Sequence, residues 1–253
     1  MRAEHAQARH EREALPAGAA GPDAVHPPAT SARLDSGPAL GEGHAMTTRD
    51  DHWEQVYEQK GSGGVSWYRP HLEQSLALIE ASGAPLTARI VDIGGGASTF
   101  VDDLLDRGFT DITIVDLSQA ALDIAQARLG ARASLVKWVQ GDVTTLDLGC
   151  AAFDIWHDRA VFHFLVAHEQ RAAYIARACC SLRTQGHVVL ATFAPDGPEK
   201  CSGLPVVRYT VGELQHQFGP AFELVAEASD RHETPWGSTQ SFVYCLCNKA
   251  LAC

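Results

Sequence analysis

The stretch IVDIGGGASTF, residues 90–100, decides the fold. It begins with β-prone apolar residues that one carboxylate interrupts, and it continues through three consecutive glycines into small hydroxyl residues. Glycine allows positive φ and lets a ligand approach the backbone closely, and a helix that starts after the turn offers unpaired N–H groups. The stretch therefore predicts a strand, a tight turn and a helix start, arranged around a bound ligand.

Composition bounds the fold class and the partners. The 253 residues, 45% of them hydrophobic, can bury a full core, which is typical of one α/β domain. The net charge of −11 argues against nucleic acid as a partner, and no apolar run reaches the length of a membrane span. The N-terminus also lacks the apolar core of a signal peptide. We therefore expect a cytoplasmic protein with no membrane or nucleic-acid partner, and the sequence makes no prediction of oligomeric state.

The seven cysteines are an odd number and include no C-x-x-C pair. Without a secretory signal, this pattern favours reduced thiols over a disulfide framework. The same spacing argues against a structural zinc site, and we expect no bound metal.

Residues 1–45 differ in composition from the rest of the chain. They are rich in Ala, Gly, Pro, His and charge and have no sustained apolar periodicity, so we expect a disordered extension. Met46, one of two methionines, opens the first stretch that looks able to fold. The extension is therefore either sequence upstream of a natural start at Met46 or a genuine tail, and residues 46–253 form the predicted domain.

Within residues 46–253, strands and helices alternate. Strands are expected over 89–93, 112–115, 135–140, 153–156 and 187–193, and helices over 51–59, 72–82, 99–107, 119–129 and 169–182. This alternation predicts parallel β-α-β units with right-handed crossovers. A capping box of Thr210 and Glu213 then opens one more helix, and 222–229 and 240–248 read as two strands that pair antiparallel.

The spacing of the glycines bears on which ligand the turn holds. A dinucleotide fingerprint needs glycine at positions 94, 96 and 99, but position 99 is Thr. Asp92, two residues before the first glycine, would add negative charge beside a pyrophosphate. It suits a cationic ligand instead.

Polar residues at the ends of three further strands support this interpretation. Asp116 ends the second strand, where a carboxylate can accept hydrogen bonds from both hydroxyls of a ribose. Asp142 follows the third strand, where it can accept a hydrogen bond from an exocyclic amine such as adenine N6. The fourth strand ends in FDIWHDRAVFHF, residues 153–164, a polar cluster at the crevice where an open α/β sheet binds a second ligand.

With these four motifs in this order, residues 52–248 resemble a class I S-adenosylmethionine-dependent methyltransferase. The resemblance implies a Rossmann-like, doubly wound α/β fold whose seven-stranded sheet is mostly parallel with the last strand antiparallel. It implies S-adenosylmethionine as the cofactor and S-adenosylhomocysteine as its product. Asp92 and the glycine turn would then face the amino-acid part of the cofactor, Asp116 the ribose and Asp142 the adenine.

The segment HWEQVYEQKGSGGVSWY, residues 52–68, resembles a helix and loop that fold over the cofactor in a subgroup of these enzymes. Its aromatic side chains would contact the sulfonium by cation–π interaction, or they pack in the core. The cofactor-binding residues implied are Trp53, Tyr57, Trp67, Asp92, Gly94, Gly95, Gly96, Ser98, Thr99, Asp116, Leu117, Asp142, Val143 and His157.

Candidates for work on the methyl acceptor follow strands four and five. A histidine can act as a base near neutral pH, and an arginine can fix an anionic group. The alternatives are a loop ion pair of Asp158 with Arg159 and a packing role for His163. The predicted catalytic residues are His157, Asp158, Arg159 and His163, and the predicted substrate-binding residues are Tyr68, Cys201, Arg208 and Tyr209.

Three functions stay open. The preferred one is methyl transfer to a small-molecule nucleophile such as a thiol, sulfide or other chalcogen, because the lid is compact and a thiolate needs little base catalysis. Methylation of a protein lysine is the first alternative, since DR after the fourth strand and the aromatic lid also resemble a lysine-methylating branch. A non-catalytic sensor of S-adenosylmethionine or S-adenosylhomocysteine is the second. WHDR at residues 156–159, in place of an Asn-Pro-Pro-Tyr-like motif, argues against the amino-methylating DNA and protein-glutamine enzymes.

Overall fold

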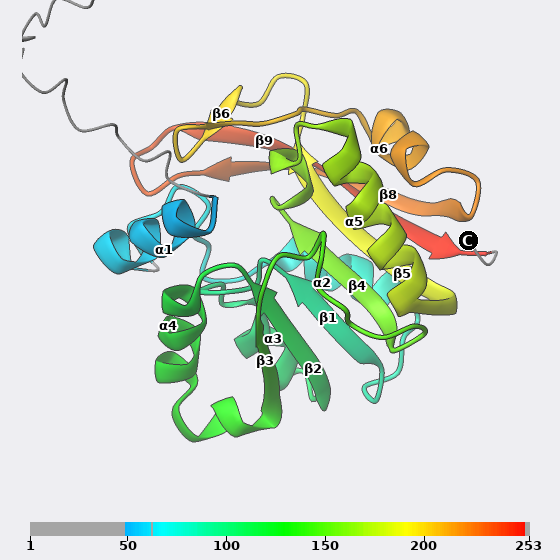
Figure 1. Cartoon of the computed structure of the whole chain (residues 1–253), viewed down its shortest axis with the longest axis horizontal. Helices are drawn as coiled ribbons and strands as arrows, with labels where there is room; N and C mark the ends of the chain where they lie inside the picture. Colours follow the sequence, from blue (N-terminus) through cyan, green and yellow to red (C-terminus); the bar gives the residue numbers. More distant parts are fainter. Residues whose placement is uncertain (1–48, 62, 251–253) are drawn as a thin grey trace, which may run out of the picture. The chain divides into compact units, whose positions relative to one another are not determined.

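A computed structural model describes residues 49–61 and 63–250 of the chain (Figure 1). The helices are α1 (Arg49–Lys60), α2 (Glu73–Ala81), α3 (Phe100–Asp106), α4 (Gln119–Leu129), α5 (His168–Ser181) and α6 (Val211–Phe218), with short 3-10 helices η1 (Gly130–Leu135) and η2 (Phe162–Phe164). The strands are β1 (Arg89–Ile93), β2 (Asp111–Asp116), β3 (Val136–Gln140), β4 (Phe153–Arg159), β5 (Leu182–Phe193), β6 (Lys200–Cys201), β7 (Leu204–Pro205), β8 (Phe222–Glu233) and β9 (Thr239–Lys249). The expected extension and its boundary at Met46 lie outside the described residues.

The main sheet has seven strands in the order β3-β2-β1-β4-β5-β9-β8. The first five are parallel, β9 runs antiparallel to β5, and β8 runs antiparallel to β9. Helices cover both faces, with α5 in front of the sheet and α2 behind it (Figure 1). The predicted α/β fold with a mostly parallel seven-stranded sheet and an antiparallel last strand is confirmed.

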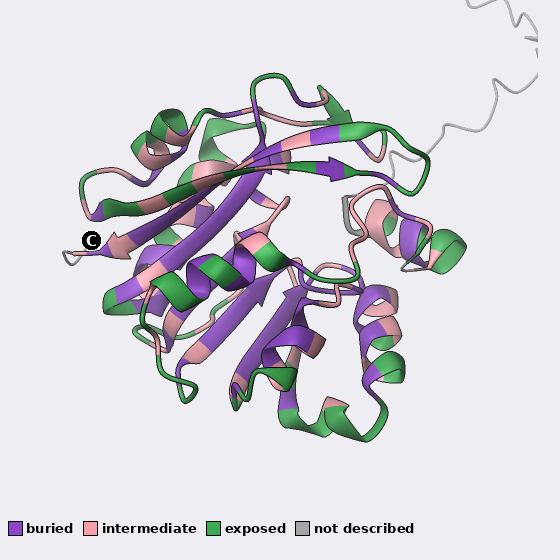
Figure 2. Cartoon of the chain, turned by 180° about the vertical axis from the view of Figure 1, so that it is seen from behind, coloured by how far each residue is buried: buried purple, intermediate pink, exposed green. Residues whose placement is uncertain are grey.

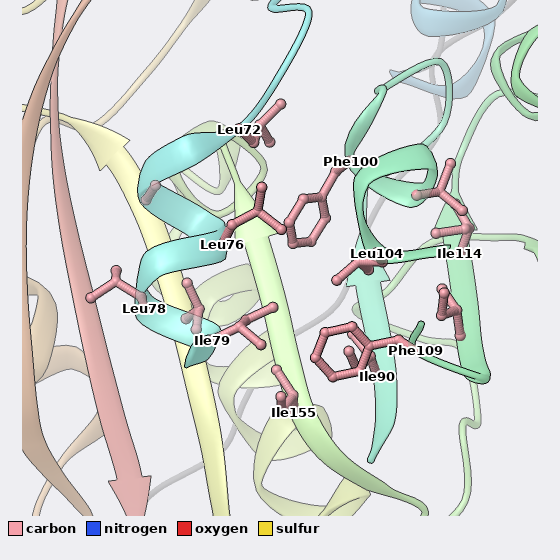
Figure 3. Close-up of a cluster of buried hydrophobic side chains, with 14 of the residues drawn as sticks. Leu72, Leu76, Leu78, Ile79, Ile90, Phe100, Leu104, Phe109, Ile114 and Ile155 are labelled. Carbon is pink, nitrogen blue, oxygen red and sulfur yellow. The ribbon is translucent and has the colours of Figure 1, made fainter. Parts of the chain in front are cut away.

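Alternation along the central strands divides the core into two layers. On one face, Ile90 and Ile155 pack with Phe100 and with apolar residues of α2 (Figure 3). On the other face, Val91 and Trp156 pack with residues of α5 and α6. The parallel strands β1, β2, β4 and β5 are buried along most of their length (Figure 2). Burial of each large aliphatic side chain contributes about 1.5–3 kcal/mol, so the two layers fix the strand ends rigidly.

Several elements extend beyond or fall outside the sequence predictions. Strand β4 continues to Arg159 because residues 157–159 pair with 189–191 of β5. Strand β5 begins five residues before the predicted start at position 187, in a polar stretch that lacks apolar alternation. The β6–β7 hairpin, of two residues per strand, was not expected, because strands this short leave no periodicity to read.

The cysteines correct one prediction. Cys150, in the loop before β4, forms a disulfide with Cys180 near the end of α5. The two positions lie 30 residues apart in the sequence and face each other only in the fold, so spacing could not reveal them. Cys201, Cys245 and Cys247 are free and buried.

Two properties of the described ranges bear on function. None of their helices combines the length and the hydropathy that crossing a bilayer requires. Within the same ranges, no three His, Cys, Asp or Glu side chains come together in a way that could hold a metal ion.

Candidate functional site

A large pocket lies at the carboxyl ends of β1, β2 and β4, under α1 and the loop that follows it. It encloses about 760 Å³, counting its open mouth. A second, smaller pocket adjoins it along the glycine turn and shares Tyr57, Trp67, Gly94 and Arg159 with it. A crevice at this edge of an open parallel sheet is where such folds bind ligands.

The glycine turn lets two carboxylates approach the backbone. Gly94 has φ +67°, and its N–H donates to the carbonyl of Val115 at 2.7 Å, which ties the turn to β2. A Cβ atom on Gly95 would overlap Oδ2 of Asp92, and one on Gly96 would overlap Oδ2 of Asp116. The packing of these two acids therefore requires Gly95 and Gly96, whereas Gly94 is required by its positive φ and by the close approach of Val161.

Asp116 ends β2 and lines the large pocket. Its Oδ1 accepts a hydrogen bond from the N–H of Ser118 at 2.9 Å. Burial raises the pKa of Asp116 to about 7; hydrogen bonds from backbone N–H groups oppose the rise, while the charge of Asp92 adds to it. Ionising Asp116 at neutral pH therefore costs free energy, and such a perturbed pKa is typical of a functional carboxylate.

Asp142 lies across the pocket from the glycine turn, just after β3. Its Oδ1 accepts hydrogen bonds from both the N–H and the hydroxyl of Thr144, each at 2.8 Å. Gly141, Asp142 and Val143 together form part of the pocket wall. This local turn holds the carboxyl group at the pocket edge.

Aromatic rings from the lid form the opposite wall. Trp53 of α1 contacts Trp67 edge-to-face at 5.6 Å between ring centroids and Phe164 at 5.0 Å. Tyr57 packs against Trp67 at 6.3 Å, and burial raises its pKa. Helix α1 is tied down because the Glu54 carboxylate accepts a hydrogen bond from the N–H of Ala120 at 3.2 Å. Three of the four predicted lid aromatics thus line the large pocket, and Tyr68 lines the smaller one.

The residues after Trp156 point in different directions. His157 and Asp158 are consecutive in β4, so their side chains lie on opposite faces of the sheet. His157 is 1% exposed, and its two ring nitrogens contact Asp92 and Ser75, which leaves neither free for an acceptor. Asp158 is fully buried and accepts hydrogen bonds from Tyr174 and from the N–H groups of residues 161 and 162. Asp158 therefore supports the loop after β4, and burial raises its pKa to about 6.

Arg159 lines both pockets. It donates to the hydroxyl of Tyr244 at 3.1 Å and to the carbonyl of Trp67 at 3.2 Å, and its guanidinium lies 4.5 Å from the centroid of the Phe242 ring. Its Nη2 is buried and has no hydrogen-bond partner among the described residues. Of the four predicted catalytic residues, Arg159 is the one that offers a pocket a free polar group.

The remaining predicted residues divide into those near a pocket and those away from it. Cys201 lines the large pocket, and burial raises the pKa of its thiol to about 11. His163 is buried beside Arg159 with its pKa lowered to about 3, and it lines neither pocket. Arg208 is engaged by Glu199 and the carbonyl of Gly197. Away from both linings lie Gly96, Thr99, His163, Arg208 and Tyr209, whereas Ser98 lines the smaller pocket and Leu117 the larger.

The sequence does not predict seven residues that line the large pocket: Ile93, Val115, Gly141, Ala160, Val161, Phe164 and Leu165. Phe164 and Leu165 come from η2 and the residue after it, and both line the large pocket. The aromatic pair in FHF, residues 162–164, was a visible signal, but which of the two rings faces the pocket depends on the 3-10 turn.

Comparison with known proteins decides the family. Residues 90–186, from β1 into β5, match the family model described as a methyltransferase domain. The predicted resemblance to the class I S-adenosylmethionine-dependent methyltransferases is thereby confirmed. The matched range contains the glycine turn, Asp116, Asp142 and the cluster after β4. The predicted S-adenosylmethionine-dependent methyltransferase enzyme is thereby confirmed.

Relatives and solved structures resemble this methyltransferase at low identity. Human EEF1A lysine methyltransferase 2 is 26% identical over 216 residues, which cover 79% of this chain and 85% of that protein. The structure of Burkholderia thailandensis 1,6-didemethyltoxoflavin-N1-methyltransferase, with bound 1,6-didemethyltoxoflavin and S-adenosylhomocysteine, aligns with a TM-score of 0.64 at 22% identity, over 84% of this chain and 94% of that one. A structure from a study of echinomycin biosynthesis aligns with a TM-score of 0.66 at 14% identity, over 80% and 92%. At these identities the solved structures establish the fold.

The side chains of the methyltransferase site fit its cofactor, S-adenosylmethionine. Oδ2 of Asp92 is buried beside the glycine turn and has no hydrogen-bond partner in the part of the chain that the structure describes, so it suits an ammonium group. Asp116 and Asp142 stand as acceptors at the ends of β2 and β3, where ribose hydroxyls and an adenine amine would find them. These residue roles remain predictions, and Figure 1 shows the converging strand ends that bring them together.

Proposed function

We propose that this methyltransferase transfers the methyl group to the ε-amine of a lysine side chain in a protein. The aromatic wall of the large pocket, formed by Trp53, Trp67 and Phe164, carries the proposal. Aromatic faces bind the methylene stem and the cationic head of a lysine. The likeness to human EEF1A lysine methyltransferase 2 over most of both chains supports it. It was the first alternative from the sequence, and the comparisons support it better than the preferred small-molecule acceptor.

The pocket has to deliver the lysine as a neutral amine. An amine pKa near 10.4 in water falls when the group enters an apolar site or lies near another cation. The aromatic wall supplies the first effect and the Arg159 guanidinium supplies the second. The described residues that line the large pocket include no histidine, so deprotonation by the environment fits this site better than a histidine base.

The cofactor supplies an electrophilic methyl group on a sulfonium, with its activation already built in. A lysine ammonium would lose its proton to water on entering the pocket, and the neutral nitrogen would then take the methyl group as the carbon–sulfur bond breaks, which leaves a methylated ammonium as the product. The residues of the chain hold the amine in line and exclude water, and such positioning accounts for most of the catalysis in this kind of displacement. Lid residues Trp53, Tyr57 and Trp67 close the pocket on the side of α1.

A small anionic acceptor is the second candidate, and one observation favours it. Nη2 of Arg159 is buried at the pocket wall and has no partner within residues 49–61 and 63–250, so a carboxylate or thiolate would complete its hydrogen bonding. This acceptor matches the small-molecule nucleophile preferred from the sequence.

Transfer from tritium-labelled S-adenosylmethionine separates the two candidates. The full chain is incubated with a cell extract divided into protein and small-molecule fractions, and with the same proteins after reductive methylation of their lysines. We expect label in the protein fraction that prior lysine modification blocks. Label confined to the small-molecule fraction would reject lysine methylation and support the anionic acceptor.

A variant of the same site gives a second reading. With a lysine acceptor, Arg159→Leu raises the pKa of the bound amine, so the pH profile of kcat shifts to higher pH. With an anionic acceptor, the variant instead raises KM for that acceptor and leaves the shape of the profile unchanged.

A further inference from the structure

Ser75, His157 and Asp92 form a buried hydrogen-bond network that ends at the smaller pocket. Oδ1 of Asp92 lies 2.6 Å from Nδ1 of His157, and Nε2 of His157 lies 2.8 Å from the hydroxyl of Ser75. All three residues are at most 2% exposed. This network connects α2, which contains Ser75, with β4 and β1, which contain His157 and Asp92.

The sheet register places the two ring partners side by side. Asp92 of β1 and His157 of β4 are direct neighbours across the parallel pair, on the face that α2 and α3 cover. The Phe100 ring packs on the imidazole with 4.1 Å between centroids. Sheet, helix and aromatic ring together leave the imidazole one orientation.

The positions of the protons in this hydrogen-bond network follow from the chemistry of its three side chains. An ionised carboxylate only accepts hydrogen bonds, so Nδ1 of His157 donates to Asp92. In the neutral ring, Nε2 is then the acceptor, and the hydroxyl of Ser75 donates to it. Each hydrogen bond fixes the next group, and a charge-assisted bond to a carboxylate is among the stronger ones. These hydrogen bonds therefore set the rotamer of Asp92.

One oxygen of Asp92 is left for a ligand. Oδ2 is buried, has no hydrogen-bond partner among the described residues and lies against the position that a Gly95 side chain would take. Asp92, Gly95 and His157 all line the smaller pocket. An ammonium group in that pocket would complete the hydrogen bonding of Oδ2.

We propose that His157 and Ser75 are positioning residues for donor binding: they orient Asp92 so that its free oxygen receives the ammonium of the amino-acid part of S-adenosylmethionine. This inference goes beyond the proposed function, because it concerns the donor and holds for any acceptor. Its failure and a failure of lysine methylation are therefore separate results.

The test compares two ligands that differ in the amino-acid part. S-adenosylhomocysteine carries the ammonium, and 5′-methylthioadenosine keeps only the nucleoside and sulfur. Binding to the full chain is measured by calorimetry for His157→Leu, His157→Asn and Ser75→Ala. Asn is informative because its side-chain NH₂ lies where Nδ1 of histidine lies and can still donate to Asp92.

We expect His157→Leu to raise the Kd for S-adenosylhomocysteine at least about tenfold and to change the Kd for 5′-methylthioadenosine by less than about twofold. His157→Asn should recover most of the loss, and Ser75→Ala should show a smaller loss, again for S-adenosylhomocysteine alone. The matched control is Ser181→Ala, because Ser181 is a buried serine of α5 on the other face of the sheet. This variant should bind both ligands with unchanged affinity.

Equal losses for both ligands would overturn the proposal, because they would mean a general effect on the fold. A His157→Asn variant as weak as His157→Leu would overturn it as well. If His157→Leu does not fold, the comparison of His157→Asn with His157→Gln decides. In His157→Gln the amide lies near the position of Nε2 of His157, so this variant should bind S-adenosylhomocysteine more weakly than His157→Asn does. Equal binding by the two variants would reject the positioning role of His157.

Discussion

Replacing Asp116 tests the ribose assignment. This carboxylate ends β2, is 8% exposed and faces the large pocket. Two ribose hydroxyls would each donate to it, and a hydrogen bond to a charged group is worth about 1.5–3 kcal/mol. Such paired bonds do not add fully, so we expect Asp116→Ala to cost about 2–4 kcal/mol of donor affinity. That loss corresponds to about 30- to 700-fold in Kd.

The assay is calorimetric titration of the full chain with S-adenosylhomocysteine at pH 8, where Asp116 is mostly ionised. Asp111→Ala is the matched control, since Asp111 lies at the opposite end of β2 in an exposed pair with Lys137 and should bind as the wild type does. Unchanged affinity in a folded Asp116→Ala protein would refute the assignment of Asp116 to the ribose.

The raised pKa of Asp116, about 7, adds a signed pH dependence. The ionised form accepts both hydroxyl hydrogen bonds, so wild-type affinity should fall between pH 8 and pH 6, whereas Asp116→Asn should vary little. Stability has the opposite sign: because the folded pKa lies above the unfolded value, protonation stabilises the fold as pH falls from about 7 towards about 4. Without ligand, Asp116→Asn should therefore raise Tm at pH 8, and the gain should fade near pH 5. A gain that is equal at both values would contradict the pKa.

Three further predictions concern the turn, the core and the disulfide. Gly95→Ala forces a Cβ against Oδ2 of Asp92, so donor affinity should fall at least about tenfold in titrations, whereas Gly212→Ala in α6 meets open space and should bind normally. Tyr174→Phe removes the donor to Asp158 and the acceptor of the Trp156 indole, and urea unfolding should show a loss of about 1–3 kcal/mol for each group left unpaired; an unchanged midpoint would contradict the network. Reduction of the 150–180 disulfide should lower the free energy of unfolding by about 2–4 kcal/mol without changing donor affinity, and urea curves of equal midpoint with and without reductant would exclude that bond.

The sequence predicted the donor side of the site more fully than the acceptor side, for a physical reason. Asp92, Gly94, Asp116 and Asp142 occupy strand ends and turns, and the carboxyl ends of parallel strands must meet at one edge of the sheet. Local patterns were therefore enough to place these residues together.

The acceptor side depends on details that local patterns do not contain. The predicted fourth strand ended at Trp156, so His157 and Asp158 were treated as loop residues that share one cluster. In the structure β4 continues to Arg159, and alternation sends His157 and Asp158 to opposite faces. The extra length comes from pairing with β5, which is a tertiary effect. The positions of His163 and Arg208 away from the pockets depend likewise on η2 and on the loop after β5.

Titration of the full chain with S-adenosylmethionine, S-adenosylhomocysteine and NAD⁺ tests the central claim most directly. We expect the first two to bind and NAD⁺ not to bind, because Thr99 replaces the third glycine and Asp92 stands beside the turn. Binding of NAD⁺ alone would contradict the assignment of the pocket to a methyl donor.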